Sequence, residues 1–423
     1  MHDASPRGTP FTIENLPYGV ISTAADPKRR AATALDDSAV DLNVLQTQGV
    51  FDNISGLPVG IFAADDLNGF AALPPSVRLA LRRRLIQALS KPSRHDVHVA
   101  AAFIPLSDVT NHYPMKTSNF SDFYCSLEHT RNCTELFNKK SIDANWFIAP
   151  SVYNGRTSSL VVSGTPITRP YGVIQPSSAD DNAGCYFGST GALDFELEMG
   201  VFLSTPVARG RRVDIGEAAQ HVFGFVLLND WSSRDIQAFE MAPLGPFHSK
   251  GSATSISPWI VVPEALEVVL GPRKTAQEPK PLPHLDWADR ERATFDIELS
   301  VKIIRDGQSF LLGQSNLNEL HWTPFQQLTH LASAGEGLAT GDLFGTGTIS
   351  SDRTDGNGEK VGLGCILERK LARNSLSALP DVAQTFLKDG DEVVMEAWCR
   401  SRTTGRFFGF GQCSGVVLPP YES

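Results

Sequence analysis

Residues 193–199 read Leu193-Asp194-Phe195-Glu196-Leu197-Glu198-Met199, a strict alternation of apolar and acidic side chains. Because successive side chains of a β-strand point to opposite faces, the pattern predicts a strand with Asp194, Glu196 and Glu198 on one side. Carboxylates two residues apart on one face can bind a hard divalent cation such as Mg²⁺ or Ca²⁺. A half-buried strand with a solvated acidic face is the competing interpretation, and the stretch taken alone favours it.

The composition of the chain limits the kinds of partner it can have. Its 423 residues favour two domains over one, and the net charge is −10. No face rich in lysine or arginine stands out, so nucleic acid is not expected as a partner. The run Arg82-Arg83-Arg84 lies in Ser76–Ser90, where apolar residues repeat at helical spacing. We interpret these arginines as the solvated face of an amphipathic helix.

The cysteines and the apolar segments indicate a compartment. The six cysteines include no Cys-x-x-Cys pair, and no basic-then-apolar leader opens the chain. We therefore expect free thiols in the reducing cytosol and a cytoplasmic protein. No apolar segment is long enough to span a bilayer, so no membrane partner is expected.

The distribution of residue types along the sequence predicts a mostly β (α+β) fold with two domains. Residues 1–108 form a small accessory domain, with short strands at 19–22 and 31–42. Residues 109–423 form a larger catalytic domain in which β-branched and aromatic runs alternate with Gly- and Pro-rich turns, as in a sandwich, barrel or roll. Its predicted strands include 160–162, 223–228, 259–262, 295–304, 392–397 and 407–410. Its few predicted helices are 122–137, 215–221, 233–239 and 323–333.

Four polar groups could converge in the larger domain. Ser121 as an N-cap would begin a helix and place Asp122 and His129, seven residues apart, nearly on one face. A carboxylate at a helix start is also a common structural device, so both interpretations remain open. Asp230 follows the apolar run 222–228, at a strand end where loops often place reactive groups.

Further candidates follow Asp230 along the chain. Arg234 and Gln237 are three residues apart on a predicted helix, and Lys250 to Thr254 follow a Pro-Leu-Gly-Pro turn. Glu368 lies in an apolar run and is either on the exposed face of a strand or the buried partner of a cation or histidine. Together with the Glu196/Glu198 pair, these groups suit metal-assisted attack of water on a carbonyl.

At this point ordered motifs are recognisable along almost the whole chain. They are Asn15–Val20, Ser121–Tyr124 with His129, Val152–Arg156, Val162–Ile167, Asp194–Met199, Asn229–Gln237, Pro243–Phe247, Ser257–Trp259 and Phe408–Cys413. This order closely resembles the fumarylacetoacetase (fumarylacetoacetate hydrolase) family. The resemblance implies an N-terminal SH3-like barrel, a C-terminal mixed β-roll and a homodimer.

The resemblance also implies roles for individual residues. The metal ligands would be Asp122, Glu196, Glu198 and Asp230, holding Mg²⁺ and/or Ca²⁺, with Lys250 and Thr254 near a second cation that also uses Asp230. His129 would be the catalytic base, oriented by Glu368. Arg234, Gln237 and Lys250 would stabilise developing negative charge, and Tyr124, Tyr153, Gln237 and Thr348 would contact the substrate.

Several positions depart from the family pattern, at one end of the expected pocket and at the second cation site. Asn138 stands where the family has an arginine that grips a substrate carboxylate, and Met241 where it has a substrate tyrosine. Asn154 replaces a histidine of the motif around Tyr153, and Ala253 replaces a glycine of the second cation site. Loss of a bidentate guanidinium is not a conservative change.

We predict metal-dependent hydrolysis of a carbon–carbon bond in a β-diketone. The favoured substrate is 4-fumarylacetoacetate, cleaved to fumarate and acetoacetate at the end of tyrosine and phenylalanine degradation. One alternative is hydrolysis or decarboxylation of another 2,4-diketo acid or acylpyruvate in a specialised pathway. The other alternative is a non-catalytic binding protein on the same fold.

Overall fold

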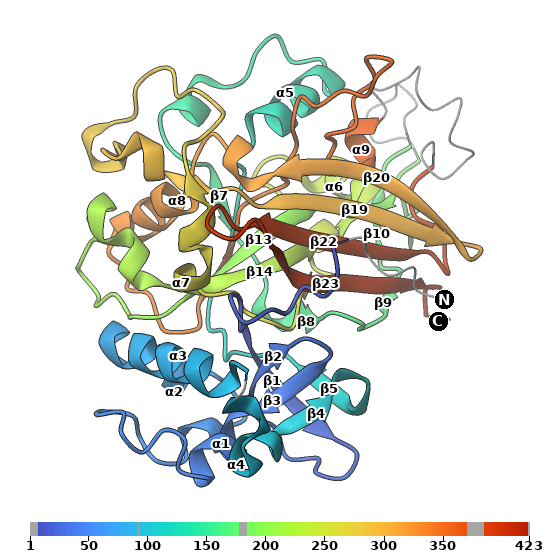
Figure 1. Ribbon diagram of the computed structural model, residues 1–423. Coiled ribbons are helices and arrows are strands. Elements are labelled where there is room, and N and C mark those ends of the chain that lie inside the picture. Colours follow the sequence, from blue (N-terminus) through green and yellow to red (C-terminus); the bar gives the residue numbers. More distant parts are fainter. Residues whose placement is uncertain (1–6, 92, 177–183, 370–384, 422–423) are drawn as a thin grey trace.

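The computed structural model describes residues 7–91, 93–176, 184–369 and 385–421. Figure 1 shows a small body of N-terminal elements below a larger body of long strands. The content is mostly sheet with short helices, as predicted from the sequence. None of the helices in these ranges combines the length and apolarity that crossing a bilayer requires.

The small body is built on one antiparallel sheet of order β4-β3-β2-β1-β5. Its strands are β1 (Tyr18–Thr23), β2 (Arg30–Leu35), β3 (Ser38–Asp41), β4 (Phe103–Pro105) and β5 (Val109–His112). Short helices α1 (Leu42–Thr47), α2 (Asn68–Ala71) and α4 (Val97–Ala100) accompany it. Because β5 pairs with β1, this sheet crosses the division predicted at residue 108. An SH3-like barrel stays a prediction.

Helix α3 (Pro75–Leu89) forms where the sequence predicts it. The predicted solvation of its arginines is wrong for Arg82, which is buried and donates hydrogen bonds to the carbonyls of Glu14 and Asn15 at 2.6 and 2.9 Å. A guanidinium supplies several donors to carbonyls that would otherwise be buried without partners. Arg82 therefore joins α3 to the segment that precedes β1.

The larger body contains a mixed seven-stranded sheet of order β7-β6-β21-β13-β14-β16-β8. Its strands are β6 (Phe120–Phe123), β7 (Val152–Asn154), β8 (Leu160–Val162), β13 (Leu197–Leu203), β14 (Val222–Asp230), β16 (Thr254–Ile256) and β21 (Leu343–Gly345). Every residue of β13 and β14 is buried, so these two strands lie at the centre of the core. The predicted strand at 259–262 is wrong, since Ile260 and Val261 make only isolated bridges to β1 and β14.

A second, five-stranded sheet has the order β20-β19-β22-β23-β9. Its strands are β9 (Ile167–Thr168), β19 (Glu298–Arg305), β20 (Gln308–Asn316), β22 (Glu392–Arg400) and β23 (Phe407–Leu418). Figure 1 shows β19, β20, β22 and β23 of this sheet as long orange and red strands beside β13 and β14. Three small two-stranded sheets join β10 (Tyr171–Ile174) to β11 (Tyr186–Ser189), β12 (Leu193–Asp194) to β15 (Ser232–Ser233), and β17 (Leu270–Gly271) to β18 (Thr294–Phe295).

The helices of the larger body are short and lie between strands. The α-helices in its described residues are α5 (Leu127–Leu136), α6 (Arg234–Glu240), α7 (Pro263–Leu266), α8 (Pro324–Leu331) and α9 (Ile366–Arg369), and its 3₁₀ helices include Ile215–His221. The predicted helices at 233–239 and 323–333 correspond to α6 and α8. The predicted helix at 122–137 begins five residues late, and this displacement matters for the site.

Candidate active site

Four buried carboxylates converge on the central sheet. Asp122 lies on β6, Glu198 on β13 and Asp230 at the end of β14, while Glu196 lies between β12 and β13. Oxygens of Asp122, Glu196 and Asp230 lie within 4.8 Å of one another. Glu198 is beside them, because a Cβ on Gly345 would come within 2.6 Å of the Asp122 carboxylate and 2.8 Å of the Glu198 carboxylate. We call these four residues the acidic cluster.

The acidic stretch at residues 193–199 is not one continuous strand with a solvent-exposed face. The strand is interrupted at Phe195 and Glu196, and all residues from 193 to 203 are buried, so the interpretation of a solvated acidic face is wrong. Asp194 and Glu196 both bind the Arg234 guanidinium, but Asp194 is not one of the acidic-cluster carboxylates. It accepts hydrogen bonds from the backbone N–H groups of Ile366 and Leu367 at 2.8 and 3.0 Å. Asp194 therefore holds the start of α9.

Asp122 is placed by a strand and not by the predicted helix. Residues 120–123 pair with β21 on one side and β7 on the other, and these ladders prevent the chain from coiling there. The helix instead begins at Leu127, with Ser126 as its N-cap accepting from the His129 N–H at 3.3 Å. The seven-residue spacing of Asp122 and His129 thus spans a strand, a connection and a helix.

Two cationic side chains enter the acidic cluster. The Lys250 ammonium contacts Glu196 and lies 3.0 Å from Asp230 Oδ2. Arg234 donates to Glu196 Oε1 at 2.8 Å and to Asp194 Oδ2 at 2.8 Å. Two cations therefore face the four carboxylates of the cluster and also Asp194, so negative charge remains in excess.

Hydroxyl groups complete the surroundings of the cluster. Tyr153 Oη lies 3.0 Å from Asp122 Oδ2 and 2.9 Å from Asp230 Oδ2, although its single proton can serve only one of them at a time. Thr254 Oγ1 donates to Asp230 Oδ1 at 2.7 Å. The structure thus brings Tyr153, Lys250 and Thr254 to the predicted metal ligands.

The electrostatics of the cluster favour a divalent cation. Burial, with the repulsion of neighbouring carboxylates, raises the pKa values of Asp122 and Glu198 well above their usual range. Burial also raises the pKa of Glu196, but Lys250 and Arg234 outweigh it and lower that pKa. Asp122 Oδ1 and Glu198 Oε1 are buried and have no hydrogen-bond partner among the described residues. An oxygen-ligated cation such as Mg²⁺ or Ca²⁺ fits these unpartnered donors and supplies the missing positive charge.

We expect cation binding to release protons and to strengthen as pH rises. Carboxyl groups with raised pKa values hold protons in the cation-free protein, and a cation must displace them. Titration calorimetry with Mg²⁺ in buffers of different ionisation enthalpy measures this release. Affinity that is equal at pH 6 and pH 8, with no proton released, would contradict the electrostatic account of Asp122 and Glu198.

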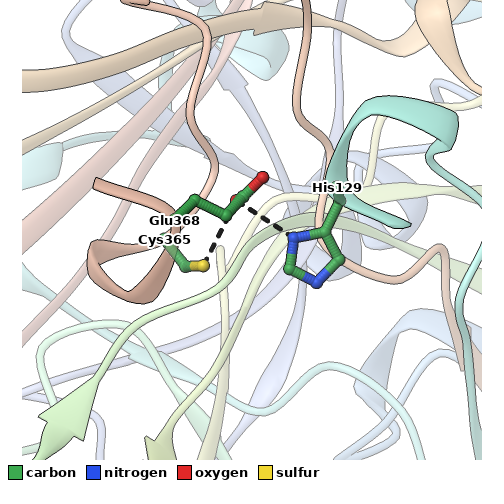
Figure 2. Close-up of side chains that lie close together, drawn as sticks. All are labelled: His129, Cys365 and Glu368. Carbon is green, nitrogen blue, oxygen red and sulfur yellow. Dashed lines mark hydrogen bonds and ion pairs between the residues drawn. The ribbon is translucent and has the colours of Figure 1, made fainter. Parts of the chain in front are cut away.

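His129 and Glu368 form a second buried group (Figure 2). His129 Nδ1 lies 3.0 Å from Glu368 Oε2, and both side chains are almost completely inaccessible. Glu368 also accepts from Asn132 Nδ2 and from Ser350 Oγ, each at 2.8 Å. Of the two interpretations of Glu368, the structure supports the buried partner of a histidine, carried on the short helix α9 rather than a strand.

The protonation of this pair follows from its surroundings. Burial opposes the charged imidazolium, but Cys133 and Glu368 outweigh it, so the pKa of His129 lies well above its usual value. Burial raises the pKa of Glu368, yet His129 and the hydrogen bonds from Asn132 and Ser350 lower it to about 2. Glu368 is therefore ionised at neutral pH and stabilises a proton on His129.

Replacing Glu368 by glutamine is expected to move the acid side of the pH–rate profile to lower pH. The neutral amide no longer stabilises the imidazolium, so the pKa of His129 falls toward that of a buried histidine. The maximal rate should also fall, because the ring loses the carboxylate that orients it. kcat/KM measured from pH 5 to pH 9 for both proteins tests this, and an unshifted acid limb would exclude Glu368 as the partner.

One segment connects the two buried groups. The N–H of Gly347 donates to Glu198 Oε2 at 3.0 Å, and three residues later Ser350 donates to Glu368. Gly347 has φ +76°, and a Cβ there would come within 2.1 Å of the Phe123 carbonyl oxygen, so glycine is required. Residues 345–350 therefore hold the acidic cluster and the His129–Glu368 pair in a fixed relation.

Some of the residues predicted to contact substrate lie in the site, and others lie outside it. Tyr124 has its ring 5.3 Å from that of His129, Thr348 is buried in the connecting segment, and Gln237 accepts from Arg234 Nη1 at 3.0 Å. Asn138 and Met241 are exposed and lie just beyond the ends of α5 and α6, outside the hydrogen-bonded network described above. Their contact with substrate stays a prediction.

Asn132, Cys133 and Cys365 were not singled out from the sequence, and the contacts of Asp194 and Ser350 were not predicted from it. Asp194 holds α9, Asn132 and Ser350 bond Glu368, and Cys365 and Cys133 flank the imidazole. Asn132 and Cys133 carry a helical signal, since they lie three and four residues after His129. Cys365 carries no sequence signal for this site, because it reaches the site from a distant element.

A cavity of about 420 Å³ lies beside α5. It borders the first turn of α5 through Leu127, Glu128 and Arg131, and His321 and Ser351 line other walls. None of the four acidic-cluster residues lines it. The donor atoms of the acidic cluster and of His129, and not the size of a cavity, therefore identify the candidate active site.

A buried oxygen-ligand cluster beside a histidine–carboxylate pair, on a mixed sheet, defines a hydrolase-type active site. Comparison with known proteins agrees. The fumarylacetoacetate hydrolase C-terminal model matches residues 118–417, and the fumarylacetoacetase N-terminal model matches residues 14–114. The chain therefore belongs to the fumarylacetoacetate hydrolase family.

Several fumarylacetoacetases are similar to this chain over nearly their whole length. The fumarylacetoacetases of Arabidopsis thaliana and Bos taurus are each 39% identical, over 97% of this chain and 96% of theirs. The human fumarylacetoacetase is 38% identical over the same shares. Among solved structures, the fumarylacetoacetate hydrolase of Exiguobacterium antarcticum has a TM-score of 0.53 at 17% identity, covering 96% of this chain and 99% of that one. That likeness supports the fold.

Proposed function

We propose that the protein hydrolyses 4-fumarylacetoacetate to fumarate and acetoacetate, the last step of tyrosine and phenylalanine degradation. The observation that carries the proposal is the joining of the acidic cluster to the His129–Glu368 pair through residues 345–350. The names and nearly full coverage of the relatives support the same reaction.

The residues of the site suit the steps of such a hydrolysis. With Glu368 at Nδ1, the neutral form of the His129 imidazole accepts a proton from water at Nε2. The resulting hydroxide adds to the substrate carbonyl, the carbon–carbon bond breaks, and the proton on Nε2 returns to the departing carbon. A bound divalent cation supplies electrophilic stabilisation of the diketone oxygens.

Negative charge on the reacting oxygens is met by donors of this chain. Arg234 Nη2 is buried and has no hydrogen-bond partner within the described ranges, while its other nitrogens bind Asp194, Glu196 and Gln237. Lys250 is held in place by Glu196 and Asp230. In comparable sites, one positioned donor to an oxyanion stabilises the transition state by about 3–4 kcal/mol.

The exposed positions Asn138 and Met241 keep a second candidate open, namely another 2,4-diketo acid or acylpyruvate. Purified protein with Mg²⁺ or Ca²⁺ should be assayed with fumarylacetoacetate, simpler acylpyruvates and oxaloacetate. The highest kcat/KM with fumarylacetoacetate supports the proposal, and a higher value with another diketo acid replaces it. Metal binding without turnover of any of these would favour the binding-protein alternative.

The remaining predictions concern the oligomeric state, the cellular compartment and the cation. We propose a homodimer in the cytoplasm that uses Mg²⁺ or Ca²⁺, as the family resemblance implies. Light scattering coupled to size-exclusion chromatography measures the mass in solution, which should be twice the chain mass of 45.9 kDa. A monomeric mass would contradict the homodimer.

A further inference from the structure

Two thiols flank the imidazole of His129. Cys365 Sγ donates to Glu368 Oε2 at 3.2 Å, on the Nδ1 side of the ring (Figure 2). Cys133 Sγ lies 3.7 Å from Nε2 on the other side. Both cysteines are buried, and neither is required by the hydrolytic steps described above.

The atoms on the Nδ1 side have the composition of a site for a thiophilic metal. Donor atoms of His129, Cys365 and Glu368 all lie within 4.8 Å of one another. His129 Nδ1 has no aligned hydrogen-bond partner among the described residues, although Glu368 Oε2 is 3.0 Å away. One imidazole nitrogen, one sulfur and one carboxylate oxygen are ligand types that Zn²⁺ commonly uses.

The spacing of these donors is close to what a tetrahedral ion requires. With Zn–N and Zn–O near 2.0 Å and Zn–S near 2.3 Å, ligand atoms of a tetrahedral site lie roughly 3.3–3.7 Å apart. The observed separations from Glu368 Oε2 are 3.0 Å to Nδ1 and 3.2 Å to Cys365 Sγ. An outward shift of a few tenths of an ångström would admit the ion, and a water or Ser350 Oγ, 2.8 Å from Oε2, can complete the coordination.

We propose that His129, Cys365 and Glu368 form a second, thiophilic metal site that takes Zn²⁺ or Cd²⁺ and inhibits the enzyme when occupied. Binding converts the Cys365 thiol to a thiolate and releases its proton to solvent. Mg²⁺ and Ca²⁺ prefer oxygen donors, so the acidic cluster and this site select different ions.

Occupation of the site disables the base. An ion on Nδ1 forces the imidazole proton onto Nε2, the nitrogen that must accept a proton from water. It also takes the Glu368 carboxylate away from the ring. This consequence rests on the proposed function, whereas the metal site itself does not.

Binding is tested directly with Cd²⁺, whose thiolate complexes absorb in the ultraviolet. The full chain is used with saturating Mg²⁺, and with Cys185→Ser as background because Cys185 is exposed. One Cd²⁺ per chain with thiolate-to-metal absorption is expected, and Cys365→Ser should remove it. The matched control Cys133→Ser should retain the signal, since Cys133 lies on the other side of the ring.

Two outcomes overturn the site: no thiolate absorption in the background protein, or an undiminished signal in Cys365→Ser. Loss of the signal in Cys133→Ser alone also overturns the assignment. Unchanged Mg²⁺ binding and near-ultraviolet circular dichroism show whether each variant is folded. Serine retains a hydroxyl donor to Glu368, which favours folding.

Inhibition is tested separately, with each variant compared to its own rate without zinc. In the background protein Zn²⁺ should suppress turnover and a chelator followed by Mg²⁺ should restore it. Cys365→Ser should require at least about tenfold more Zn²⁺ for the same suppression. Equal zinc sensitivity overturns the inhibitory role. Absence of turnover in every protein would refute the proposed function while leaving the Cd²⁺ result intact.

Discussion

Replacing His129 by alanine is expected to lower kcat by about 10²- to 10⁴-fold, the usual worth of a positioned general base. The imidazole is the only basic group paired with Glu368 in the described structure, and alanine leaves water without a proton acceptor. Mg²⁺ binding should be unchanged, because His129 is not a member of the acidic cluster. Steady-state kinetics and calorimetric Mg²⁺ titration of the same preparation provide both measurements.

The control for this variant is Cys133→Ser, one helical turn further along α5. It leaves His129 and Glu368 in place while altering the atom beside Nε2. A His129→Ala protein with the rate of the unmodified chain would remove His129 as the base. A protein that loses both turnover and Mg²⁺ binding would indicate general disruption of the site instead.

Replacing Asp122 by asparagine is expected to abolish tight Mg²⁺ binding and to lower kcat by roughly 10³-fold, because electrophilic stabilisation by a cation is worth several kcal/mol. The same change should stabilise the cation-free protein. It removes a buried carboxylate with an unpartnered oxygen from beside Glu198 and Asp230, while the remaining amide oxygen can still accept from Tyr153.

Thermal unfolding with a chelator and with excess Mg²⁺ distinguishes these effects. The asparagine variant should have a higher midpoint than the unmodified chain in chelator, and a smaller increase on adding Mg²⁺. Asp352→Asn, at an exposed position, should change neither quantity. An Asp122→Asn protein that keeps the full Mg²⁺-induced increase would show that Asp122 is not a ligand.

The parts of the fold with regular patterns were predictable. Helix α3 follows its apolar repeat, and β14 and β22 follow their β-branched and aromatic runs. The segment at 120–137 was not, because Ser121 and Asp122 have the composition of a helix start. Pairing with β21 and β7 places them in a strand, and this tertiary contact outweighs the local preference.

The acidic stretch at residues 193–199 is a second case in which the local sequence pattern does not predict the tertiary contacts. Alternation placed Asp194, Glu196 and Glu198 on one face, as a regular strand requires. The strand is interrupted at Phe195 and Glu196, and Asp194 binds the start of α9 as well as Arg234, which Glu196 also binds. No local pattern reports this, because the partners of Asp194 lie about forty and more than one hundred and seventy residues further along the chain.

By itself the sequence determined the family, the mostly β architecture and the identity of the side chains able to hold a cation or accept a proton. These follow from residue types and their order. Only the tertiary structure decided which of them meet: the acidic cluster, the pairing of His129 with Glu368, the thiols beside the ring and the segment 345–350 that joins the groups. Such contacts arise when distant strands pair and bury polar atoms, which must then find partners across the fold.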